Sequence, residues 1–206
     1  VLNYAQQLYL LRGEQGRLAE VEPLVVASVS ETAIVPAWRC GLADFYAASG
    51  RLAEARRELD ALASDGFASL PRDSTWLTAL VLLSSVCCRL GDERRAELLY
   101  DLLRPYAGRV AIARPLVVLV GTVDDRLGQL AGLLGRFDDA ERHFADALAL
   151  AERMRAAPWQ AHVRHAWAGM LLRRGDADAR RRAHALLDEA ERIARPLGMG
   201  LLLGWV

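Results

Sequence analysis

Two histidines have the spacing that most resembles a metal site. His162 and His165 are three residues apart, so on a helix both rings would lie on one face. A metal centre also needs a third ligand and a carboxylate that orients the imidazoles, and the sequence around this pair offers neither. We therefore expect no metal. The pair fits either a groove that contacts a ligand or ordinary surface histidines.

The chain lacks the common motifs of catalysis and cofactor binding. Its 26 strongly basic residues are all arginine, so a phosphate-binding loop ending in Gly-Lys-Ser or Gly-Lys-Thr is absent. The patterns Gly-x-Ser-x-Gly, His-Glu-x-x-His and Cys-x-x-Cys are absent as well. We expect no catalytic residues, no cofactor and no enzyme activity.

The three cysteines indicate a reducing compartment. Cys40 stands alone and Cys87 is adjacent to Cys88, which is neither a metal-ligand spacing nor a disulfide pattern. We expect one thiol of the adjacent pair in the core and the other in a groove. The chain carries no signal peptide and no apolar run of membrane-spanning length, so we predict a cytoplasmic protein without membrane contact.

The charge pattern argues against nucleic acid as a partner. Twenty-six arginines balance 26 acidic residues, and the formal net charge is zero. Clusters such as Arg180–Arg182 alternate with Asp and Glu at helical spacing, which is typical of a solvated outer face. We therefore expect no direct binding of nucleic acid.

Internal repeats show how these residues are positioned. The pentapeptide Gly-Arg-Leu-Ala-Glu occurs at Gly16–Glu20 and again at Gly50–Glu54, and related turns begin at Gly91, Gly135 and Gly175. Successive turn glycines are 34, 41, 44 and 40 residues apart. Each glycine separates two stretches whose apolar residues recur every three or four positions. This pattern predicts a helix–turn–helix unit repeated five times.

The turn residues predict the local geometry. A helix can end on a left-handed glycine, so we expect positive φ at Gly50 and Gly135, and Asp92 is placed to cap the next helix. We expect the segment 107–120 to be a long loop, with a short strand as the open alternative. The predicted helices are 2–13, 17–31, 35–49, 52–64, 73–90, 93–106, 119–134, 137–155, 158–174 and 179–196.

The sequence thus predicts an all-α fold, an α-α superhelix of about five helix–turn–helix repeats, with residues 1–206 as a single domain. The chain does not begin with Met and starts within an amphipathic pattern, so we expect a fragment of a longer multidomain protein. Its apolar end, 201–206, is expected to be the first turn of a truncated helix folded back on helix 179–196. We also expect this tail to support weak homodimerisation.

The fourth unit resembles a tetratricopeptide repeat. In that motif small residues let two helices approach closely, and an aromatic ring fills the gap beside them. The matching residues are Leu127, Gly128, Ala131, Gly135, Ala140, Phe144 and Ala147.

The repeat units are longer than the 34-residue standard, so the chain is similar rather to the degenerate repeats at the C-terminal end of large bacterial signalling ATPases. These include LuxR-type transcription regulators of the maltose-regulator kind and ATPase-linked class III nucleotide cyclases. The segments 98–109, 133–144 and 197–199 carry this resemblance.

The repeat register predicts a candidate site. With each turn glycine at repeat position fifteen, positions two, five, nine, twelve and thirteen face the concave groove of a repeat array. The candidate groove residues are Cys40, Asp44, Ser85, Cys88, Arg89, Thr122, Asp125, Gln129, His162, His165 and Arg173.

The resemblance implies a non-catalytic module for protein interaction or regulation within a signalling or transcription-regulatory ATPase. Its partners would be a protein, a peptide or other domains of the parent protein. The peptide-carboxylate clamps of co-chaperones need Lys and Asn at the groove positions, and their absence here argues against that partner class. The alternative is a domain that senses a small-molecule effector, because the resemblance to the maltose-regulator family implies that the repeat region receives an inducer.

Overall fold

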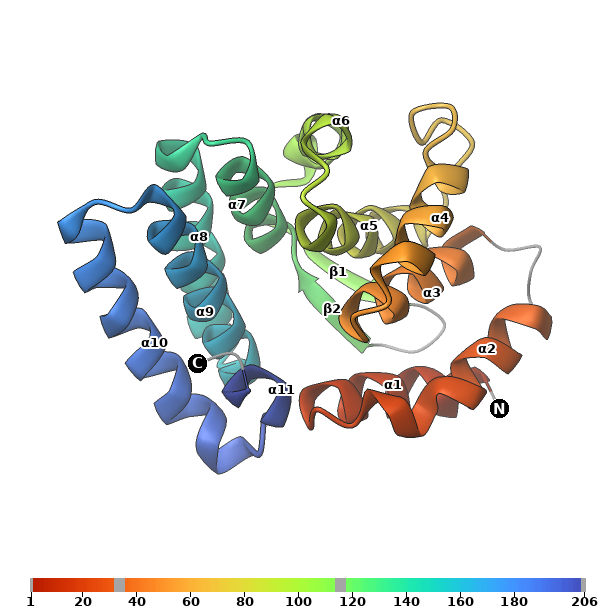
Figure 1. Ribbon diagram of the computed structural model, residues 1–206, viewed down its shortest axis with the longest axis horizontal. Helices are drawn as coiled ribbons and strands as arrows, with labels where there is room; N and C mark the ends of the chain where they lie inside the picture. The colour runs from red at the N-terminus through yellow and green to blue at the C-terminus, as the bar shows by residue number, and fades with distance from the viewer. Residues whose placement is uncertain (1, 32–35, 114–117, 205–206) are drawn as a thin grey trace.

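Helices make up most of the structure. The computed structural model describes residues 2–31, 36–113 and 118–204 (Figure 1). The expectation of a mostly helical chain is confirmed. The helices are α1 (Leu2–Glu14), α2 (Glu22–Glu31), α3 (Pro36–Ala48), α4 (Leu52–Leu62), α5 (Trp76–Leu90), α6 (Glu93–Leu103), α7 (Val123–Leu133), α8 (Phe137–Arg153), α9 (Ala157–Arg174), α10 (Ala177–Leu197) and α11 (Gly200–Leu203), with short 3₁₀ turns at Leu18–Val21 and Arg104–Tyr106.

The helices pack as consecutive pairs that follow one another around an arc. Helix α1 packs on α2, α3 on α4, α5 on α6, α7 on α8 and α9 on α10. From α3 onward, the first helix of each pair also packs on the first helix of the next, in the order α3, α5, α7, α9. The arc bends until α11 meets the C-terminal end of α1 (Figure 1).

Glycine ends the first helix of a pair where the chain must reverse. Gly50 has a φ of +77° and Gly135 a φ of +73°, which confirms the predicted left-handed conformation at both turns. After the corresponding glycine of the third pair, the Asp92 carboxylate accepts a hydrogen bond from the backbone N–H of Arg95 and caps α6. The turn positions predicted from the repeats are therefore correct.

The segment 107–120, expected to be a loop, contains strand β1 and the start of strand β2 instead, and the predicted helix 119–134 starts too early. Strands β1 (Val110–Ala113) and β2 (Val118–Thr122) pair antiparallel, and α7 begins only at Val123. Two features explain the late start: the β-branched residues of this segment favour extended backbone, and the Thr122 side chain accepts a hydrogen bond from the N–H of Asp125. The alternative of a short strand was thus the right one.

Close packing of α7 on α8 depends on Gly128. A Cβ atom built at this position would lie 2.9 Å from Cδ1 of Phe144, closer than real Cβ contacts. The Phe144 ring cannot give way easily, because it is fully buried and stacked on Trp167 with 6.1 Å between ring centroids. Ala140 and Ala147 are fully buried beside it. The steric roles expected for these residues are confirmed.

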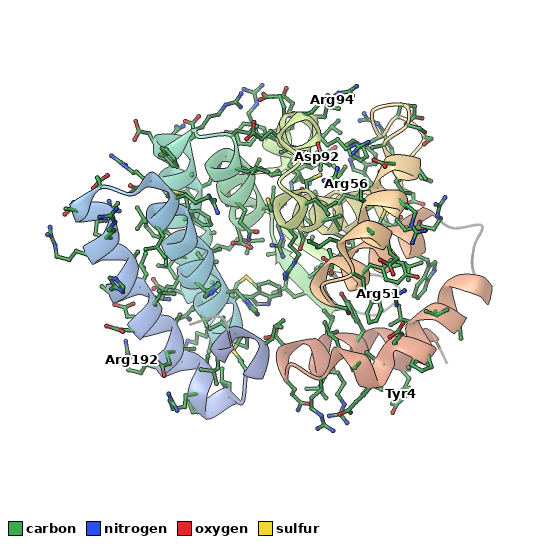
Figure 2. All side chains as sticks on the ribbon, in the orientation of Figure 1. Tyr4, Arg51, Arg56, Asp92, Arg94 and Arg192 are labelled. Carbon is green, nitrogen blue, oxygen red and sulfur yellow. The ribbon has the colours of Figure 1, made fainter. Side chains whose placement is uncertain are left out.

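Ion pairs on the outer side join neighbouring pairs of helices. Arg51 pairs with Glu22 of α2 and with Glu54 of α4. Further along, Nη1 of Arg56 lies 3.3 Å from an oxygen of Asp92, and this contact connects α4 with the start of α6. Figure 2 labels Arg51, Arg56 and Asp92. Because these side chains are at least partly exposed, solvent screens their charges and the pairs add little to stability.

The C-terminal tail folds back as expected. Leu202 of α11 is fully buried against Ala161, Ala190 and Ala194 of α9 and α10. The intramolecular burial of Leu202 removes part of the apolar surface on which dimerisation was expected to rest. Residues 205–206 lie outside the described part, and self-association stays a prediction.

Two glycine-to-alanine substitutions should change stability in opposite directions. Gly128→Ala should lower the free energy of unfolding by about 1–3 kcal/mol, because the new methyl group overlaps the Phe144 ring. Gly169→Ala, also inside a helix, should raise it by about 0.5–1 kcal/mol, because a Cβ there meets no atom within 4 Å. Urea denaturation of both variants measures the difference. A stabilised Gly128→Ala variant would contradict the packing of α7 on α8.

Candidate functional site

A central pocket of about 400 Å³ lies on the inner side of the arc. The first helices of the five pairs, α1, α3, α5, α7 and α9, all contribute residues to its lining. Leu18, Val120 of β2 and Leu201 of α11 complete the lining. Along α9 the pocket extends from Trp159 to Arg173, a rise of about 21 Å at 1.5 Å per residue.

Most of the candidate residues predicted from the sequence meet in this pocket. They come from four different helices, and the repeat register alone placed them on the inner face. The predicted residues that line the pocket are Asp44, Ser85, Cys88, Arg89, Asp125, Gln129, His162, His165 and Arg173.

Two predicted candidates, Cys40 and Thr122, do not line the pocket. Cys40 is fully buried in the hydrophobic core, so the repeat register was wrong at this position of α3. Thr122 is 1% exposed and its hydroxyl oxygen caps α7, because the helix starts later than predicted.

Four polar or aromatic residues of the pocket were not among the candidates. Tyr9 and Glu14 come from α1, for which the register was not applied. Arg126 and Trp159 lie beside predicted positions, on α7 and α9. Arg126 directly follows Asp125 and Trp159 lies three residues before His162, but neither falls at a groove position of the repeat register.

The pocket is closed at one end by contacts between the first and last pairs. Oxygens of Glu14 lie 2.8 and 3.0 Å from Nε2 of His162. Nearby, the backbones come so close that a Cβ at Gly200 would lie 2.5 Å from the carbonyl oxygen of Gln15. Glu14 is therefore the carboxylate that orients His162, and it comes from a residue 148 positions away.

A second carboxylate on the same side is held by a tyrosine. The Tyr9 hydroxyl donates a hydrogen bond of 2.8 Å to Oδ2 of Asp44. Burial and the negative charge of Asp44 raise the pKa of Tyr9 well above its ordinary value. Tyr9 thus stays protonated at any physiological pH and holds α1 on α3.

The opposite wall contains a buried carboxylate that is only partly satisfied. Asp125 is 1% exposed, and its Oδ2 accepts a hydrogen bond of 3.0 Å from the Gln129 amide. The same oxygen lies 3.6 Å from Nη1 of Arg126. Oδ1 of Asp125 and Nε of Arg126 are buried without a hydrogen-bond partner among the described residues. Buried polar atoms without a hydrogen-bond partner are uncommon in native structures.

The cysteines of α5 have the two positions expected of them. Cys87 is fully buried in the core and Cys88 lines the pocket. Burial raises the pKa of the Cys88 thiol to about 12, although the guanidinium groups of Arg126 and Arg173 act in the opposite direction. A nucleophilic cysteine needs a lowered pKa, so this thiol is unsuited to covalent catalysis.

A chain of three titratable side chains outside the pocket has a structural role. Asp124 accepts a hydrogen bond of 2.6 Å from the N–H of Gly108. Its other oxygen lies 3.3 Å from Nδ1 of His143, and Nε2 of His143 lies 3.1 Å from the hydroxyl of Tyr100. The order acid, histidine, hydroxyl resembles a catalytic triad, but Tyr100 is 7% exposed. The chain connects the loop before β1 to α6, α7 and α8.

Comparison with protein-family models, with curated proteins and with solved structures yields no match. Among the residues that the structure describes, no group of three or more His, Cys, Asp or Glu side chains could hold a metal ion. In the same part of the chain, no helix has the length and hydropathy needed to cross a bilayer.

Alkylation of Cys88 should follow its raised pKa. The thiolate is the reactive form, so the rate with iodoacetamide should rise about tenfold per pH unit from pH 7 to pH 10. An ordinary cysteine with a pKa of about 8.5 levels off within this range. Mass spectrometry of the native protein measures the rate, with Cys88→Ser as the control. A plateau near pH 8.5 would contradict the buried position of the thiol.

Proposed function

We propose that this chain is a tetratricopeptide-like regulatory domain of a bacterial signalling or transcription-regulatory ATPase, and that its central pocket binds a small-molecule effector. The observation that carries the proposal is the pocket itself. Its volume of about 400 Å³ lies within the range of small-molecule sites, and residues of five inner helices converge on it.

The closure of the arc favours an effector over the extended protein or peptide partner considered from the sequence. A peptide lying along a repeat array needs a groove that is open at both ends. Here α1 and α11 meet, and the pair Glu14–His162 spans the place where such a peptide would leave. A compact ligand suits this geometry better.

The lining suits binding rather than catalysis. Cys88 has a raised pKa, and the carboxylates of Asp44 and Glu14 are held by Tyr9 and His162. Because a ligand would touch helices of several pairs at once, its binding would fix the curvature of the arc. A change of curvature is a signal that the other domains of the parent protein can receive.

A side chain added at Gly169 should block the pocket without disturbing the fold. Gly169 lines the pocket, and a Cβ there meets no atom within 4 Å, so Gly169→Leu projects into open space. A screen of small metabolites by thermal unfolding should find compounds that raise the Tm of the wild-type protein. The same compounds should leave the Tm of Gly169→Leu unchanged.

Gly169→Ala is the matched control and should keep the ligand response. Trp159 gives a second measurement, because bound ligand should change its fluorescence and Trp159→Phe should remove that change. Equal responses of Gly169→Leu and the wild-type protein would show that the ligand binds elsewhere. If no compound raises the Tm, the effector function is wrong.

A further inference from the structure

Three guanidinium groups gather on the wall of the pocket formed by α5, α7 and α9. Arg89 and Arg173 lie in the last turns of α5 and α9, and Arg126 lies near the start of α7. All three line the pocket, and the charges of all three act on the thiol of Cys88, with Asp125 acting in the opposite direction. The positive charges therefore converge on one region of the pocket.

The acidic groups of the pocket have partners other than Arg173, and Asp125 lies beside Arg126. Asp44 accepts its hydrogen bond from Tyr9, and Glu14 pairs with His162 at the far end of the pocket. Within the described ranges, no carboxylate lies within ion-pair distance of Arg173. Its guanidinium packs over Gly132 of α7, where a Cβ would lie 3.0 Å from Nη2. Gly132 thus makes room for this charge at the pocket wall.

Asp125 adds a second requirement at the same wall. Its Oδ1 has no hydrogen-bond partner among the described residues, although the residue is 1% exposed, and the neighbouring Nε of Arg126 also lacks one. A group that bound here would therefore bring both an acceptor for the arginines and a donor for the carboxylate. A simple cation, a simple anion or an apolar ligand satisfies only part of this set.

We propose that this wall binds a small organic acid with a hydroxyl or amino group next to its carboxylate. Arg173 and Arg126 hold the carboxylate by charge-assisted hydrogen bonds, and Asp125 accepts a hydrogen bond from the neighbouring hydroxyl or amino group. The apolar remainder of the ligand lies along α9 toward Trp159. This inference rests on the proposed effector function and specifies the chemical class of the effector.

The test compares related compounds on the full 206-residue chain. The probes are malate, citrate, glutamate and phenyllactate. Each is measured beside its amide, in which the negative charge of the carboxylate is removed. Each is also measured beside the matching acid without the hydroxyl or amino group, which is succinate, tricarballylate, glutarate and phenylpropionate, respectively. Isothermal calorimetry at low and high salt should show the hydroxy and amino acids binding best, with affinity that falls as salt screens the arginines.

Two variants separate the two contacts. Arg173→Gln should weaken the acids about tenfold or more and leave the amides unchanged. Asp125→Asn should abolish the preference for hydroxy and amino acids over the unsubstituted acids. Arg181→Gln is the matched control for charge, because Arg181 is 76% exposed and pairs with Asp178 on the outer side of α10. It should bind like the wild-type protein.

The outcomes distinguish this inference from the proposed function. If neutral compounds bind in the pocket, lose affinity in Gly169→Leu and are unaffected by Arg173→Gln, the effector function stands and the acid class is wrong. If acids bind equally to Arg173→Gln and Arg181→Gln, the arginine wall is not their site and the inference is overturned. If neither these probes nor the metabolite screen gives binding, both proposals fail.

Discussion

The meeting of the first and last helix pairs is the contact on which the rest of the site depends. Helix pairs that stack with a constant bend produce an open arc, and an open arc has only a groove on its inner side. The bend here is large enough to bring Gly200 against the backbone of Gln15, with Glu14 paired to His162 beside it. This contact converts a groove into a pocket with walls on several sides.

Glycine at close contacts makes such tight curvature possible. Gly128 lets α8 lie against α7, Gly132 lets α9 lie against α7, and Gly200 lets the last helix touch the first. In each case a methyl group would come closer than 3.0 Å to a neighbouring atom. These glycines therefore allow the helices to approach closely, within a pair at Gly128 and between pairs at Gly132.

Much of this arrangement could be predicted from the sequence, because it depends on local rules. The turn glycines Gly50 and Gly135 follow from the need for a left-handed residue at a tight reversal. The nine predicted residues that line the pocket follow from counting helical positions between such turns. Thr122 was misplaced because β2 delays α7, and extended and helical backbone compete closely in a β-branched segment. Tyr9 and Glu14 were not predicted as pocket residues, because their neighbours in the pocket belong to distant helices. No local rule specifies how far a series of helix pairs bends.

The long separation between Glu14 and His162 also bears on how the protein folds. Each helix pair can form from neighbouring residues joined by a short turn, whereas closure connects positions 148 apart. By loop-closure entropy, such a loop costs only about 1.3 kcal/mol more than a loop of one 34-residue repeat. The pairs can thus assemble one after another and the ends join last, so the pocket comes into being at the final step. An array whose ends separate again would lose its pocket while its helices remain folded.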